Sequence, residues 1–96
     1  MGLRVIRAEI IDKLKTGRIQ HELDRSGNID EKNLLIIEKI SVEEVVNLVN
    51  ITKGFEYELS KHHFLPTLDV HIFKPLKKAV RWYIKCYLLE PNVIFI

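Results

Sequence analysis

The pattern of hydrophobic residues changes along the chain from a helical period to an alternating one. In the first segment, apolar side chains recur every three or four positions, at Leu3, Ile6, Ile10 and Leu14. This spacing is typical of an amphipathic helix. Gly17 follows at the point where the left-handed end of a helix favours glycine. The pattern therefore predicts a helix over 3–16.

Two more helices are predicted before Gly54. Asp30 is a suitable N-cap for a helix over 31–39. Ser41, with Glu44 three residues later, has the spacing of a capping box. Valines then follow at helical intervals, at Val42, Val45, Val46 and Val49. We expect this last helix to begin after Ser41 and to end before Gly54.

After Gly54 the hydrophobic residues alternate, which is the period of a β-strand. In "TLDVHIF" one face carries Leu68, Val70 and Ile72, and the other carries Asp69, His71 and Phe73. In "VRWYIKCYLL" the apolar face consists of Val80, Trp82, Ile84, Cys86 and Leu88, and the opposite face of Arg81, Tyr83, Lys85 and Tyr87. The final "NVIFI" is apolar on both faces, as in a central strand. Pro91 and Asn92 predict the turn that precedes it.

Together these elements predict an α+β fold, with N-terminal helices packed on one face of a C-terminal antiparallel sheet. We expect one domain over 1–96. No apolar run approaches the roughly 20 residues of a membrane span. Charges at Arg4 and Arg7 interrupt the segment where a signal peptide would be apolar. The single Cys86 cannot form an internal disulfide, which agrees with a reducing compartment. We therefore expect a cytoplasmic protein without a membrane partner.

The polar face of the predicted sheet combines cations with aromatic rings. If Leu68, Val70 and Ile72 meet the helices, the other face collects His71, Arg81, Tyr83, Lys85 and Tyr87. Such a face suits RNA, because cations neutralise phosphates and rings stack on unpaired bases. Lys77 and Lys78, in the loop between the strands, would extend the positive charge. The alternative is an ordinary solvated sheet face, since antiparallel sheets often have one. The net charge of +2 does not decide between the two.

Three histidines lie close together in the sequence, at His62, His63 and His71. A zinc site would need about four ligands. His62 and His63 are adjacent, so on an extended segment they point in opposite directions, and Cys86 belongs to the apolar face. We therefore expect neither a metal nor another cofactor.

Metal-free cleavage of RNA is the chemistry that this combination of residues could support. It requires a base for the 2′-hydroxyl, a cation for the phosphorane and an acid for the departing oxygen. We expect Tyr83 and His71 to be central to it. Arg81, Lys85, Tyr87, Lys77 and Lys78 would bind the RNA, and Lys61 with His62 or His63 would assist from the loop before the strand.

The segments "KISVEEVVNLVN", "DVHIFKP" and "RWYIKCYLLEPNVIFI" resemble the MqsR family of bacterial toxins, small RNases with a RelE-like fold. The resemblance implies that Tyr83 corresponds to the family's active-site tyrosine. The family's glutamine corresponds to Leu68 here, and its loop lysine has Lys61 as the nearest cation. The aromatic residue of the family's "D-V-Y" is His71. The resemblance thus implies that the chain has the fold of this family but that some of the family's catalytic residues are replaced.

The function implied is that of the toxin in a type II toxin–antitoxin pair. Such a protein would be an endoribonuclease, or mRNA interferase, that cuts single-stranded mRNA without a metal and is neutralised by a protein antitoxin. Its partners would be mRNA and that antitoxin. The alternative is a non-catalytic module that uses the same sheet face to bind RNA or another protein.

Overall fold

The computed structural model describes residues 2–22, 40–62 and 64–96. The helices are α1 (Leu3–Lys15), α2 (Val42–Ile51) and the short 3-10 helix η1 (Gly54–Glu56). The strands are β1 (Ile19–His21), β2 (Tyr57–Lys61), β3 (Asp69–Phe73), β4 (Leu76–Lys77), β5 (Val80–Arg81), β6 (Ile84–Leu89) and β7 (Asn92–Phe95). The predicted α+β fold class is confirmed. No helix in the described ranges is both long enough and apolar enough to span a bilayer.

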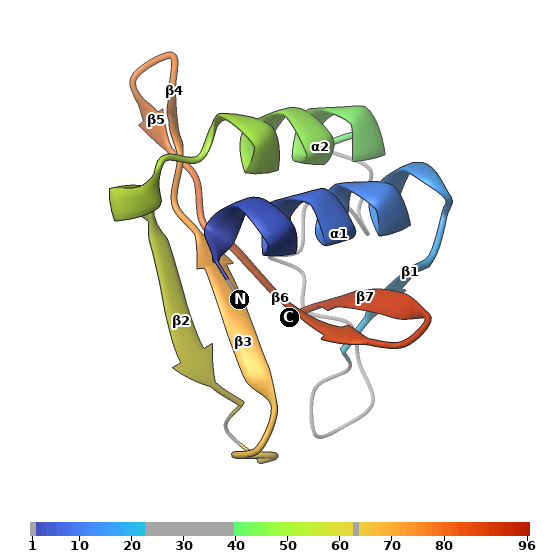
Figure 1. Cartoon of the computed structure of the whole chain (residues 1–96). Coiled ribbons are helices and arrows are strands. Elements are labelled where there is room, and N and C mark those ends of the chain that lie inside the picture. The colour runs from blue at the N-terminus through green and yellow to red at the C-terminus, as the bar shows by residue number, and fades with distance from the viewer. Residues whose placement is uncertain (1, 23–39, 63) are drawn as a thin grey trace.

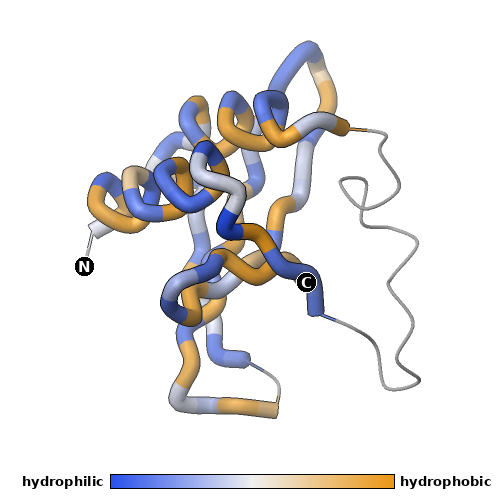
Figure 2. Tube along the Cα trace, turned by 90° about the vertical axis from the view of Figure 1, so that its right-hand side faces the viewer, coloured by the Kyte–Doolittle hydropathy of each residue, from blue (hydrophilic) through white to orange (hydrophobic). Residues whose placement is uncertain are grey.

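The two longer helices begin and end close to the predicted positions. Gly17 has a φ of 74°, so the chain leaves α1 through the left-handed conformation that favours glycine. The Ser41 Oγ accepts a hydrogen bond from the Glu44 backbone N at 3.1 Å, which caps α2. Hydrophobic and hydrophilic residues alternate along both helices, as expected where one side faces the core (Figure 2). Asp30 and the predicted helix over 31–39 lie outside the described residues.

Five strands form one sheet in the order β1-β7-β6-β3-β2 (Figure 1). β7 lies between two other strands, which confirms the central strand predicted from "NVIFI". β1 runs parallel to β7, with Ile19 opposite Val93, whereas the other neighbours are antiparallel. The sheet is therefore mixed rather than purely antiparallel. The three residues of β1 carried no clear signal, because so short an alternation is not distinctive.

α1 and α2 lie side by side on the same side of the sheet (Figure 1). The main core between them and the sheet consists of Ile6, Ile10, Leu14, Val45, Val49, Phe73, Cys86, Val93 and Phe95. A second, smaller cluster consists of Val70, Ile72, Tyr87 and Ile94. Because neighbours on a strand point to opposite faces, this second cluster lies on the face turned away from α1 and α2. We call it the distal face.

The two faces of β3 are the reverse of the prediction. His71 pairs with Cys86 and Phe73 with Ile84, so His71 and Phe73 face the helices. Val70 and Ile72 lie on the distal face instead. The prediction was wrong because β3 is buried on both sides from Val70 to Phe73, so alternation alone could not tell which apolar set meets the helices.

The single strand predicted over 80–89 is divided in two. The Trp82 backbone N donates to the Pro75 oxygen at 2.9 Å, and β5 pairs with β4 in a separate two-stranded sheet. This β4–β5 hairpin projects beyond the five-stranded sheet (Figure 1). Its two-residue turn has positive φ at both Lys78 (51°) and Ala79 (64°), the geometry of a type I′ turn.

Candidate functional site

Glu22 is the centre of a polar network on the distal face. The Glu22 backbone N donates to the Phe95 oxygen at 2.8 Å, which holds the residue beside β7 just after β1 ends. One carboxylate oxygen, Oε2, lies 2.8 Å from the His62 Nε2 and accepts from the Tyr87 hydroxyl at 2.7 Å. Three segments that are distant in sequence therefore meet at a single oxygen atom.

The backbone determines the tautomer of His62. Its Nδ1 accepts hydrogen bonds from the backbone N of Phe64 and of Leu65, both at 3.1 Å. Nδ1 therefore carries no proton, and Nε2 donates to Glu22. The imidazole is buried and meets the Tyr87 ring edge-on, with the ring centroids 5.2 Å apart. His62 is thus a fixed donor that orients the carboxylate.

The protonation states of Glu22 and Tyr87 support each other. Burial raises the pKa of Tyr87 to about 12, and the hydrogen bond to Glu22 and its negative charge contribute to this rise. For Glu22, burial acts to raise the pKa, but the hydrogen bonds from His62 and Tyr87, together with the positive charge of Lys85, outweigh it. The pKa of Glu22 is therefore lowered. At neutral pH Glu22 is ionised and Tyr87 keeps its proton.

This network lines an open depression of about 260 Å³. The other lining residues are Ser60, Lys61, Phe64, Val70, Lys85 and Ile96. Phe64 is 59% exposed and offers an aromatic surface at the depression. The site thus combines an ionised carboxylate, the Lys85 side chain and an exposed ring, with Lys61 at its border. Chemically it can accept a proton, balance negative charge and stack on a base.

Three of the predicted site residues line this depression, namely Lys61, His62 and Lys85. A fourth, Tyr87, is joined to it through its hydrogen bond to Glu22. Glu22 was not predicted. The only local signal for it is that Glu22 continues the alternation of β1, which places it on the distal face with Gln20. Its contacts to His62 and Tyr87 span 40 and 65 residues of sequence, so the sequence alone could not have revealed them. His63 lies outside the described residues.

His71 does not lie on the distal face, contrary to the prediction. It is 5% exposed on the helix-covered face, directly opposite Cys86. Its Nδ1 lies 2.6 Å from the Tyr57 hydroxyl. The predicted group of His71 with Arg81, Tyr83 and Lys85 is therefore not formed, because the register of β3 turns His71 to the other side of the sheet.

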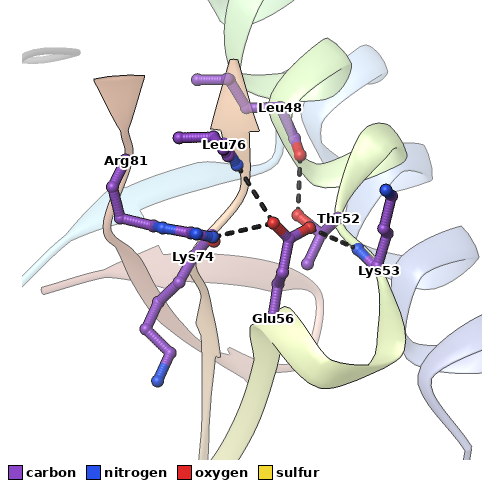
Figure 3. Close-up of polar contacts among 7 residues, drawn as sticks. All are labelled: Leu48, Thr52, Lys53, Glu56, Lys74, Leu76 and Arg81. Atoms are coloured by element: carbon purple, nitrogen blue, oxygen red, sulfur yellow. Dashed lines mark hydrogen bonds and ion pairs between the residues drawn. The ribbon is translucent and has the colours of Figure 1, made fainter. Parts of the chain in front are cut away.

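Arg81 is held by the buried carboxylate of Glu56 (Figure 3). The Arg81 Nη1 donates to the Glu56 Oε2 at 2.8 Å and to the Lys74 oxygen at 2.7 Å. Glu56 also accepts from the backbone N of Lys53 at 2.9 Å and of Leu76 at 3.2 Å. The hydrogen bond from Lys53 is the main reason that the pKa of Glu56 is lowered. Arg81 thus fastens the β4–β5 hairpin to the segment after α2.

The remaining predicted residues belong to the hairpin and its base. Lys77 forms an ion pair with Glu44 at 3.6 Å, and Lys78 occupies the turn. Tyr83 is 63% exposed between β5 and β6. Neighbouring carboxylates therefore offset part of the positive charge predicted for this edge. RNA binding by these residues stays a prediction.

No group of three or more potential metal ligands is assembled within the described ranges. No protein-family model matches the chain, and no curated protein sequence matches it significantly.

Proposed function

We propose that the chain is a metal-independent endoribonuclease that cuts single-stranded RNA on the distal face, as the toxin of a type II toxin–antitoxin pair. The observation that carries the proposal is the convergence of His62 and Tyr87 on one oxygen of Glu22, at 2.8 and 2.7 Å, in a depression that Lys61 and Lys85 also line. The toxin class and the mRNA substrate rest on the resemblance to the MqsR family.

The proposed reaction is attack of the 2′-oxygen on the adjacent phosphorus. The Glu22 carboxylate takes the 2′ proton as the new P–O2′ bond forms. The hydrogen bonds from His62 and Tyr87 both end on Oε2, so Oε1 is the oxygen that the 2′-hydroxyl would meet. The Lys85 ammonium balances the charge of the phosphorane. As the P–O5′ bond breaks, a solvent water gives a proton to the 5′-oxygen, and the product ends in a 2′,3′-cyclic phosphate.

His62 and Tyr87 act in this scheme as positioning residues. Their hydrogen bonds hold the carboxylate in one orientation and keep it ionised at neutral pH. Phe64 provides a surface on which an unpaired base can stack. This requirement for an unstacked base favours a single strand over a duplex.

The first test is cleavage of a single-stranded RNA by the purified chain in EDTA. We expect a 2′,3′-cyclic phosphate product and no cleavage at a 2′-deoxy linkage. Glu22→Gln should slow the reaction by about 100-fold, since it removes the general base. Glu58→Gln is the matched control. Glu58 is an exposed carboxylate in an ion pair with Lys74 at 3.1 Å and does not line the depression, so this variant should cleave at the parent rate.

The Tyr83→Ala variant distinguishes a reaction at Glu22 from one at Tyr83, the active-site residue that the family resemblance implies. If Tyr83→Ala abolishes cleavage and Glu22→Gln does not, the assignment of Glu22 as the base is wrong. Salt-sensitive RNA binding with intact RNA would favour the alternative, a non-catalytic RNA-binding module. In a bacterium, induced expression should stop growth and degrade mRNA, whereas induced Glu22→Gln should do neither.

A further inference from the structure

A second cavity lies on the opposite, helix-covered side of β2 and β3. Its volume is about 310 Å³. Four of its lining side chains are aliphatic, namely Ile6, Leu59, Leu68 and Leu88. The other four can form hydrogen bonds, namely Tyr57, Thr67, Asp69 and His71. This open cavity therefore offers hydrogen-bonding groups beside an equal share of apolar surface.

The polar pair in this cavity is neutral. The Tyr57 hydroxyl lies 2.6 Å from the His71 Nδ1, and the two rings are stacked with an interplanar angle of 18°. Burial raises the pKa of Tyr57 and lowers the pKa of His71, although Asp69 and Glu9 partly oppose the latter shift. Tyr57 therefore keeps its proton and His71 stays uncharged. With Nδ1 bonded to Tyr57, the His71 Nε2 is the ring nitrogen that can bond a ligand, as donor or acceptor according to the tautomer.

Asp69 gives the same cavity an anionic acceptor. Its Oδ1 accepts from the Lys61 Nζ at 2.8 Å, and this hydrogen bond is the main cause of its lowered pKa. A carboxylate disfavours a phosphate inside the cavity. A neutral flat ring with both N–H donors and acceptors would satisfy Asp69, Thr67 and His71 while its faces contact the leucines. Nucleobases have this chemistry.

We propose that this cavity binds a nucleobase of the RNA strand whose cleaved phosphate lies at Glu22. The proposal rests on the function proposed above. Lys61 lies at the border of the two sites: it lines the edge of the depression, and its Nζ pairs with Asp69 on the helix-covered side. The strand passes Lys61, and a neighbouring base enters between Tyr57, Leu59 and Leu88. The cavity thereby selects among bases at a position next to the cleaved bond.

The test is a titration of the intact chain followed by nuclear magnetic resonance. The four ribonucleosides are added one at a time, and then a single-stranded oligonucleotide with 2′-deoxy linkages. We expect at least one nucleoside, and the oligonucleotide, to shift the signals of the His71 imidazole and the Leu88 methyl groups. Asp69→Asn should weaken nucleoside binding about tenfold, the effect of losing a hydrogen bond to a charged group.

Glu58→Gln is again the control, because Glu58 accepts a lysine at a similar distance but does not line the cavity. Equal binding by Asp69→Asn and Glu58→Gln, or no shift of His71 with any nucleoside, would overturn the proposal. Shifts with nucleosides but not with the oligonucleotide would assign the cavity to a free nucleoside and overturn its role in RNA. The Glu22→Gln variant should bind nucleosides in the cavity as the parent does. A loss of RNA cleavage therefore leaves the binding result unaffected.

Discussion

At the scale of single residues, Glu22 gives the distal face its chemical character. Tyr87 was predicted to stack on RNA, but its ring is buried and its hydroxyl donates to Glu22 instead. His62 was expected in a loop, and its two ring nitrogens are held by backbone N–H groups and by the same carboxylate. Both side chains therefore hold the Glu22 carboxylate in one orientation.

The hydrogen bond between Tyr87 and Glu22 can be tested by titrating the phenols. In the intact chain, Tyr87 should ionise near its raised pKa of about 12. Glu22→Gln removes the negative charge that disfavours the phenolate, so the pKa of Tyr87 should fall toward the ordinary value of 10.0. Ultraviolet absorption of tyrosinate against pH measures this shift. An unchanged Tyr87 pKa in Glu22→Gln would contradict the network, and Glu58→Gln should behave as the parent.

At the scale of elements, a helix or strand could be predicted where its hydrophobic pattern was compatible with a single structure. The helical valines after Ser41 and the doubly apolar "NVIFI" produced α2 and the central β7. β3 was ambiguous because both of its faces are buried, and the choice between them depends on its pairing with β6. That choice moved His71 away from Lys85. The predicted catalytic group was therefore wrong because the sequence analysis assigned the wrong face of β3 to the helices.

The turn of the β4–β5 hairpin offers a test of local strain. Lys78 and Ala79 both have positive φ, where Asn and Gly are much more common. Replacing the pair by Asn-Gly should raise the free energy of unfolding by about 1 kcal/mol, because it relieves a left-handed conformation of ordinary residues. Denaturant unfolding measures the difference.

Ala79→Val is the opposing control for the turn, since a β-branched residue at positive φ is more strained still. It should lower the free energy of unfolding. A stabilised Ala79→Val, or a destabilised Asn-Gly variant, would show that the turn is not type I′. Neither change touches the depression, so RNA cleavage should persist in both.

At the scale of the whole molecule, α1 and α2 occupy one side of the sheet and the Glu22 site lies on the other. The fold class followed from the change of hydrophobic period along the chain. The site did not, because its central contacts join β1, the end of β2 and β6 over separations of 40 and 65 residues. Lys61 lies where the two sides meet, since it borders the depression and its Nζ pairs with Asp69 in the cavity on the helix-covered side.

The central claim is that RNA binds on the distal face, and mapping the bound strand tests it most directly. The measurement is the change in backbone amide resonances when the intact chain binds a single-stranded oligonucleotide with 2′-deoxy linkages. We predict the largest changes at Glu22, Ser60, His62, Phe64 and Lys85. Changes confined to the β4–β5 hairpin and Tyr83, with Glu22 and Lys85 unaffected, would contradict the account.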